Sequence, residues 1–440
     1  MKRPLVHGAL GTVVAASLCL FLSSEHRVVL IVGVALSLIL LAWIACHGWE
    51  GPLAAVVVAI AFTPEVVVAS LPLRAEDFIV PCWLVVAWRQ GRWRGLWGRA
   101  LTGIIMAWMT IVGIATMRGM AQGWIQPGVA LCHGGKTLEY LLLSLLVCRC
   151  LTTVQDVRWA VWCSVAAAVA SALLFGVMTD LVVPDTELRH IIEEYFPGEG
   201  SNILGGYFMY QSLIGISICL AQPAQRRMVL LAGALFLPLA SALFSTASRS
   251  SLVGSLVGFT ALGAWVNRWL WLVVILLVLL APWYLPPGTW YFVRLAAMEL
   301  TGQVRWNWAT RLEEWRVDWD YIRQRPLLGY GLSIRPPSPM TGQAGPVDNE
   351  YLKVWLETGL FGLVVFAWFL VRAGRVARRV YQTSADPWCK ALAAGYGAGL
   401  IALLIHGLLA TSFTAVRTAE AFWFMTGILI VADRLVSPTP

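Results

Sequence analysis

Charged residues are scarce in this sequence. Lys, Arg, Asp and Glu together make up 13% of its 440 residues, whereas soluble domains carry roughly a quarter. Hydrophobic residues make up 59%, and the mean hydropathy is +0.72. So little charge leaves too few polar side chains for a water-soluble surface, and the composition alone indicates an integral membrane protein.

Several chemical signatures are also missing. The sequence has no P-loop, no glycine-rich dinucleotide fingerprint and no metal-binding pair among its six histidines. The nine cysteines are scattered, mostly inside hydrophobic runs, and show no metal-ligand spacing. We therefore expect no cofactor, no metal site and no disulfide framework. The net charge of +8 lies largely in short basic loops, as membrane topology requires, so it does not indicate nucleic-acid binding.

Hydrophobic runs of about twenty residues recur along the chain, which is the length that a membrane helix needs. We predict an all-α polytopic membrane protein with about 12–14 transmembrane helices. Its predicted spans are 5–22, 28–45, 52–70, 78–88, 100–117, 136–151, 157–178, 203–221, 228–246, 250–266, 269–285, 351–371, 388–411 and 418–434.

Basic loops set the expected orientation of these spans. Arginines in 89–99, 226–227 and 372–379 fall on one side if the spans alternate, and that side is cytoplasmic by the positive-inside rule. The loop 286–350 is then periplasmic. We divide the chain into an N-terminal helix bundle (1–285), a large periplasmic loop with short helices that carries site residues (286–350) and the C-terminal helices of the same bundle (351–440).

The only long polar stretch, 305–362, begins in this loop. Its first part is a charged, Trp-rich segment, predicted to be a helix that ends at Pro326. Arg311, Trp315 and Trp319 recur every four residues and share one face of that helix. Aromatic rings such as Trp315 can stack on sugars, although a helix lying on the bilayer surface explains the same pattern.

Two arginines are candidates for binding phosphate. Arg249 stands between Ser248 and Ser250 at the predicted start of a helix, where free backbone amides favour an anion. An interfacial arginine that reaches lipid headgroups is the alternative. Arg311 is the second candidate, and a surface helix with ordinary salt bridges is its alternative. The loop also carries Arg305, Arg316 and Arg335 as further cations.

A polar tripeptide, Asp348-Asn349-Glu350, precedes the next hydrophobic run. Asp and Asn are preferred helix N-caps, so the tripeptide is well suited to begin a helix near Tyr351. It also places two carboxylates at the mouth of a membrane helix, where they could act on a membrane-bound substrate.

The order of these motifs carries a family resemblance. Pro326–Gly331, Asn349–Leu352 and Glu357–Gly362 follow one another, after Ser248-Arg249-Ser250 and a weaker motif of Asn202 with two glycines. This pattern resembles the O-antigen ligase and polymerase superfamily over roughly the C-terminal two thirds of the chain. The resemblance implies a metal-independent, inverting glycosyltransferase of the bacterial inner membrane. Such an enzyme transfers an oligosaccharide from undecaprenyl pyrophosphate to a sugar or glycolipid acceptor on the periplasmic side.

The resemblance also implies roles for individual residues. Arg249 and Arg311 would hold the pyrophosphate leaving group, and Asp348 would be the base that takes the proton of the acceptor hydroxyl. Family ligases usually carry His at the position of Asp348, so this departure favours a polymerase of lipid-linked repeats over a ligase that acts on lipid A-core. Glu350 is the alternative base. The predicted substrate-binding residues are Asn349, Glu350, Arg305, Arg335, Trp315 and Asn202.

A second class of protein remains open at this stage. A lipid-linked sugar transporter would also have many spans and a few intramembrane charges, but transporters often show internal repeats, and we find none here. The expected partners are the lipid-linked donor, the glycan acceptor, membrane lipids and a chain-length regulator.

Overall fold

The computed structural model describes residues 50–63, 66–68, 71–89, 100–182, 200–220, 226–246, 248–268, 308–337 and 347–436, with a few single positions between 270 and 279. The predicted spans 5–22 and 28–45, and most of 269–285, lie outside the described residues. The helices within that part are α3 (Glu50–Phe62), α4 (Glu76–Arg89), α5 (Ala100–Ala121), α6 (Pro127–Cys150), α7 (Val154–Val182), α9 (Ser201–Leu220), α10 (Arg226–Ser245), α11 (Arg249–Trp265), α14 (Trp308–Gln324), α15 (Glu350–Thr383), α16 (Pro387–His406) and α17 (Val416–Val436).

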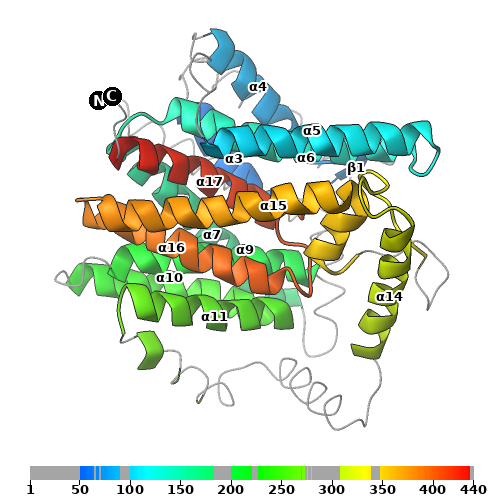
Figure 1. Ribbon diagram of the computed structural model, residues 1–440. Coiled ribbons are helices and arrows are strands. Elements are labelled where there is room, and N and C mark those ends of the chain that lie inside the picture. Colours follow the sequence, from blue (N-terminus) through cyan, green and yellow to red (C-terminus); the bar gives the residue numbers. More distant parts are fainter. Residues whose placement is uncertain are drawn as a thin grey trace.

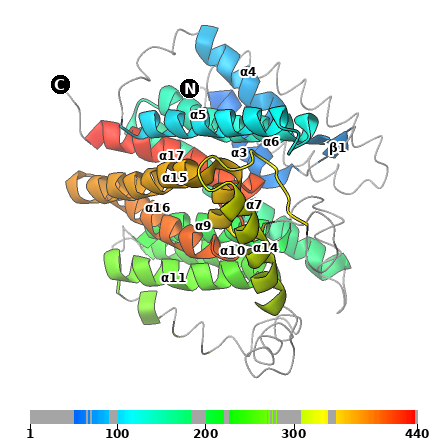
Figure 2. The ribbon, with the colours of Figure 1, turned by 45° about the vertical axis from the view of Figure 1, so that its right-hand side comes forward.

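The long helices pack side by side as a bundle (Figures 1 and 2). α9 and α16 lie in its interior, with α11 and α10 on one flank and α17, α6 and α5 on the other. The interior is apolar and rich in aromatic rings: Trp423 stacks on Phe369 with 4.8 Å between centroids, and Phe413 meets Phe422 edge-on at the same distance. Small residues let these helices approach closely, as membrane bundles require.

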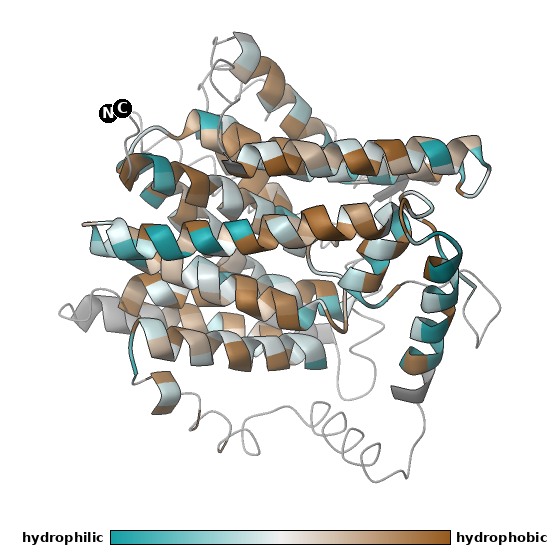
Figure 3. Cartoon of the chain, in the orientation of Figure 1, coloured by the Kyte–Doolittle hydropathy of each residue, from teal (hydrophilic) through white to brown (hydrophobic). Residues whose placement is uncertain are grey.

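Six of the described helices are long and apolar enough to cross a membrane: α5, α6, α7 as far as Phe175, α9, α15 and α16. Figure 3 shows their hydrophobic colouring, which contrasts with the hydrophilic α14 and with the C-terminal half of α15. The structure thus confirms an all-α polytopic membrane protein, and adds one short antiparallel hairpin of β1 (Val66–Val68) and β2 (Leu71–Leu73).

That hairpin makes the predicted span 52–70 wrong in its second half, because α3 ends at Phe62. The apolar run continues, but Pro64 disfavours helix at the residue before it, and β-branched valines follow. The basic segment 372–379 is also not a loop. It forms the last turns of α15, which runs twelve residues beyond the predicted end at residue 371.

The predicted polar helix is present as α14 and ends two residues before Pro326. It runs across the direction of the long helices at one end of the bundle (Figures 1 and 2). α9, α11, α15 and α17 all begin at this same end, where α16 finishes. The N-termini of four helices therefore lie at one end of the bundle, where the helix dipoles favour negative charge.

Candidate functional site

The turn 326–331 forms backbone hydrogen bonds with α15 around Gly359. α15 is kinked at Gly359, whose φ of 71° is a left-handed conformation that glycine adopts without steric cost. The backbone groups freed by the kink are satisfied by the turn after α14: the amide of Leu360 donates to Pro326 O (2.8 Å), and the carbonyl of Leu356 accepts from Tyr330 N (2.9 Å). Gly359 thus allows the kink in α15. The pairing fixes α14 beside the start of α15.

The segment 407–415, which connects α16 to α17, is the support on which the polar tripeptide rests. Asn349 caps α15 by accepting from Tyr351 N and Leu352 N, at 3.0 and 3.1 Å. Its amide nitrogen donates to Leu408 O at 3.0 Å. The predicted cap is thus present: the side-chain oxygen of Asn349 caps α15, and its nitrogen ties the helix to the segment.

Glu350 accepts more hydrogen bonds from this segment than Asn349 makes with it. Its side chain is completely buried, and one carboxylate oxygen accepts from Ser412 N (2.6 Å) and Phe413 N (3.1 Å). The other oxygen accepts from the hydroxyl of Thr414 at 3.0 Å. A carboxylate with three donors and no exposed surface has the geometry of a structural anchor, and it has no lone pair directed at solvent.

Arg311 and Asp348 come together above this support. The guanidinium of Arg311 donates to Leu409 O at 2.6 Å, and its other terminal nitrogen lies 3.6 Å from Asp348 Oδ2. The two side chains are 21% and 36% exposed, so both can be reached by a substrate. The structure therefore brings together a cation and a carboxylate that are 37 positions apart in the sequence (348 minus 311).

Asp318 is a third acidic group at this site, and sequence reasoning did not single it out. It is buried on α14, and burial raises the pKa of its carboxyl to about 7, helped by the negative charges of Glu314 and Asp348. The available signal was its spacing of seven residues from Arg311, which places both on one helix face. A carboxylate that titrates near neutrality is suited to proton transfer at physiological pH.

The raised pKa of Asp318 predicts a pH-dependent cost to folding. The unfolded chain ionises this carboxyl near the ordinary aspartate pKa of 3.8, while the folded protein resists ionisation up to about 7. Stability is therefore complete at low pH and is lost as the pH rises through this window. Asp318→Asn should raise the apparent Tm at pH 8 by about 2 °C or more and leave it unchanged near pH 4, in thermal denaturation of the detergent-purified protein.

Asp320→Asn is the matched control, because this neighbouring carboxylate on the same helix is 69% exposed. It should shift the apparent Tm by the same small amount at every pH. A pH-independent difference for Asp318→Asn would instead mean that the substitution changes packing rather than charge.

A second group of candidate residues lies where α9 and α11 begin. Ser248 caps α11, accepting from Ser251 N, and its hydroxyl donates to Asn202 Oδ1 at 2.8 Å. Ser250 also donates to Asn202 Oδ1, at 3.3 Å. Arg249, the first residue of α11, is partly buried between these serines. Asn202 and Arg249, predicted from separate motifs, are thus neighbours in one hydrogen-bonded cluster.

His406 connects this cluster to the support under Asp348. Its Nδ1 shares a hydrogen bond of 2.7 Å with the Ser412 hydroxyl, next to the amide that Glu350 holds. Its Cε1 lies 3.1 Å from the position of a Cβ on Gly206, one turn from Asn202. His406 is completely buried. The two groups of candidate residues therefore belong to one continuous polar region.

The remaining predicted residues are placed less centrally. Arg335 is exposed on the turn that follows α14, and Trp315 is partly buried on α14. Its neighbour on the same face, Trp319, meets Trp355 of α15 edge-on at 5.2 Å. Arg305 lies outside the described residues. Among the described residues no group of His, Cys, Asp or Glu is arranged to hold a metal ion.

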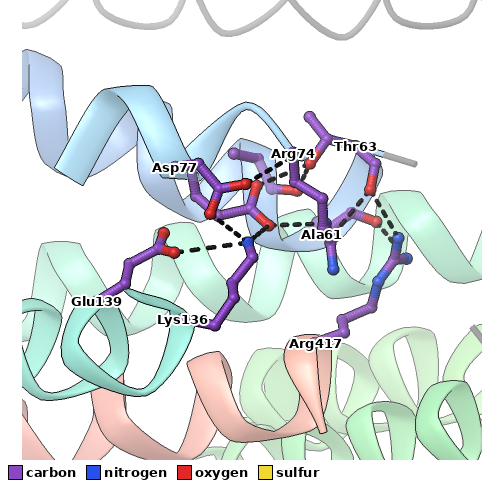
Figure 4. A network of polar contacts seen from close by, with 9 residues as sticks. Ala61, Thr63, Arg74, Asp77, Lys136, Glu139 and Arg417 are labelled. Carbon is purple, nitrogen blue, oxygen red and sulfur yellow. Dashed lines mark hydrogen bonds and ion pairs between the residues drawn. The ribbon is translucent and has the colours of Figure 1, made fainter. Parts of the chain in front are cut away.

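A buried network of charges lies beside this region. Lys136 of α6 reaches three carboxylates, Asp77 at 2.5 Å, Glu139 at 3.4 Å and Glu76 at 3.8 Å (Figure 4). Arg74 in turn forms an ion pair of 2.6 Å with Glu76. Among the described side chains these are the best-shielded ion pairs, and they tie α4 to α6.

Two arginines join the network to the end of α3. Arg74 donates to Thr63 O at 2.8 Å, and Arg417 of α17 donates to Ala61 O at 2.9 Å and to Thr63 O at 3.3 Å (Figure 4). Both satisfy carbonyl groups that the end of α3 leaves free. The residue after Arg417, Thr418, donates to Ile203 O at 2.6 Å, next to Asn202. The network thus supports the helix end that carries a candidate site residue.

Comparison with known proteins gives one family match. A search of curated proteins gave no match. Residues 233–367 match the family model described as O-Antigen ligase, a range that contains Arg249, Arg311 and Asp348. This match covers about a third of the chain and supports an O-antigen ligase or polymerase type of membrane glycosyltransferase.

Proposed function

We propose that this protein is a polymerase of lipid-linked repeats, which moves an oligosaccharide from undecaprenyl pyrophosphate to the sugar of a second lipid-linked repeat. The observation that carries the proposal is the Arg311–Asp348 pair, which is exposed at the end of the bundle and held on the 407–415 segment. In this assignment the loop 286–350 is periplasmic, the protein lies in the bacterial inner membrane, and a chain-length regulator acts with it.

The reaction that fits these groups is an inverting transfer. The acceptor hydroxyl attacks the anomeric carbon while the bond from that carbon to the pyrophosphate oxygen breaks on the opposite face. The hydroxyl proton passes to Asp348, and the carrier pyrophosphate leaves with the electron pair. Arg249 and Arg311 stabilise the negative charge that grows on the leaving group, as fixed cations do in a preorganised site.

The choice between polymerase and ligase rests on position 348. Family ligases usually carry His there, whereas this chain has an aspartate next to an arginine. Transfer to lipid A-core is the alternative.

Deleting the gene and examining surface glycans separates the polymerase from the ligase. Single repeats on lipid A-core indicate a polymerase, and long chains left on the carrier lipid indicate a ligase. Movement of the donor across the membrane without any new glycosidic bond would reject both in favour of a transporter.

The role of Arg249 can be tested by keeping its charge and changing its shape. Arg249→Lys should lower turnover about tenfold or more with normal folding, because lysine lacks the two-pronged geometry that phosphate accepts. The measurement is glycan transfer by the purified protein in nanodiscs, with Arg268→Lys beyond α11 as the control. Full activity of Arg249→Lys with normal donor affinity would make Arg249 an interfacial anchor.

A further inference from the structure

Three basic side chains from separate parts of the chain gather beside the candidate site. They are His133 of α6, Arg335 of the turn after α14 and Lys353 of α15. Both Arg335 and Lys353 act electrostatically on the His133 ring, and both also act on the carboxyl of Glu357.

The packing of the backbone agrees with this proximity. A Cβ on Gly134, the neighbour of His133, would lie 4.0 Å from Leu332 Cδ1. The next residue, Ser333, donates its N–H to Glu357 Oε1 at 3.1 Å, and Glu357 lies one helical turn after Lys353. The turn that carries Arg335 therefore contacts α5 and α6 as well as α15.

This basic cluster, His133, Arg335 and Lys353, has little negative charge of its own. The ammonium of Lys353 bonds to a neutral partner, the Thr414 hydroxyl, at 3.0 Å. Among the described residues no carboxylate lies within 4.0 Å of Lys353 or Arg335, and Glu357 accepts a backbone N–H. Ser333 has a left-handed backbone (φ 66°), and its buried hydroxyl has no partner within the described part of the chain. Lys353 and Arg335 thus make no direct ion pair within the described residues, and two such cations beside an unused hydroxyl favour an anionic ligand.

Lys353 of the basic cluster and Arg311 bond to different residues of the same segment. Along the 407–415 segment, Arg311 is held at Leu409, whereas Lys353 is held at Thr414. The carboxylate of Glu350 accepts hydrogen bonds from Ser412, Phe413 and Thr414 of the same segment. Arg311 thus contacts Asp348 directly, whereas Lys353 contacts a different residue of the same segment.

We propose that the basic cluster binds an anionic group, a carboxylate or a phosphate, on the glycan acceptor and so selects acidic acceptors. The inference rests on the proposed function, because it assigns the anion to the acceptor side of the transfer. The other source of the same chemistry is the pyrophosphate of the donor, and the experiment separates the two.

The test measures binding, without any transfer reaction, by calorimetry on the full chain in nanodiscs. The probes are a glucuronate-bearing disaccharide, a phosphorylated disaccharide, the matching neutral disaccharide and inorganic pyrophosphate. The wild-type protein should bind at least one anionic disaccharide about tenfold or more tightly than the neutral one, as a charge-assisted contact provides. Lys353→Met and Arg335→Met should remove that preference and leave pyrophosphate affinity unchanged.

Two further variants make the result decisive. Lys353→Arg keeps the charge and should keep the preference, which separates lost binding from lost folding. Arg323→Met removes an exposed arginine of α14 that lies 4.0 Å from Asp320, and should change nothing. Equal affinity of the wild-type protein for acidic and neutral disaccharides overturns the proposal. Loss of pyrophosphate binding in Lys353→Met overturns the acceptor assignment and gives the cluster to the donor. A failure of glycan transfer alone would bear only on the proposed function.

Discussion

Asp348→Asn should lower the rate of glycan transfer by about 10²–10⁴-fold, the usual contribution of general-base catalysis. The amide keeps the size of the side chain and its place beside Arg311 but cannot take the proton of the acceptor hydroxyl. Folding and donor binding should stay normal, because α15 is capped by Asn349 and anchored by Glu350 rather than by Asp348. Single-turnover assays of the purified protein measure the rate of glycan transfer, and a separate binding experiment measures donor affinity.

Asp348→His sharpens this prediction. If position 348 is the base, histidine should restore part of the activity and move the pH optimum toward its own pKa of about 6.5. Glu313→Gln, an exposed carboxylate on α14, is the control and should leave turnover unchanged. Near wild-type turnover of Asp348→Asn would mean that this residue is not the base. The search would then move to Asp318, because the completely buried carboxylate of Glu350 already has three donors.

Lys136→Met should destabilise the protein by about 3–5 kcal/mol, the cost of leaving buried carboxylates without their cation. The ammonium of Lys136 is 13% exposed and lies within 4.0 Å of three carboxylates, so solvent cannot replace it. Chemical denaturation of the detergent-purified protein measures the loss.

A double substitution separates charge from packing in this network. Asp77→Asn removes the closest carboxylate, 2.5 Å from Lys136, and should restore part of the stability in the Lys136→Met background. Arg323→Met is the control, because its ion pair is exposed and contributes little. If Lys136→Met costs no more than this control, the network does not stabilise the fold.

The sequence by itself determined the class of the fold and the local polar elements. Scarce charge and recurring apolar runs required a helical membrane protein, and the structure confirms helices over most of the predicted spans that it describes. α14 and the cap at Asn349 were also predicted, because helix periodicity, Pro326 and capping preferences act over a few neighbouring residues. The family motifs could be recognised in the sequence because each of them is also made of a few neighbouring residues.

Only the tertiary structure decided which of these residues meet. The turn at 326–331 binds the kink at Gly359, and the 407–415 segment gathers Arg311, Asn349 and Glu350 from two distant elements. Nothing local in the sequence marks 407–415 as a support, since its backbone amides and carbonyls, rather than its side chains, make most of these contacts. The raised pKa of Asp318 and the charges around Lys136 likewise depend on burial and on neighbours far away in the chain, which only packing creates.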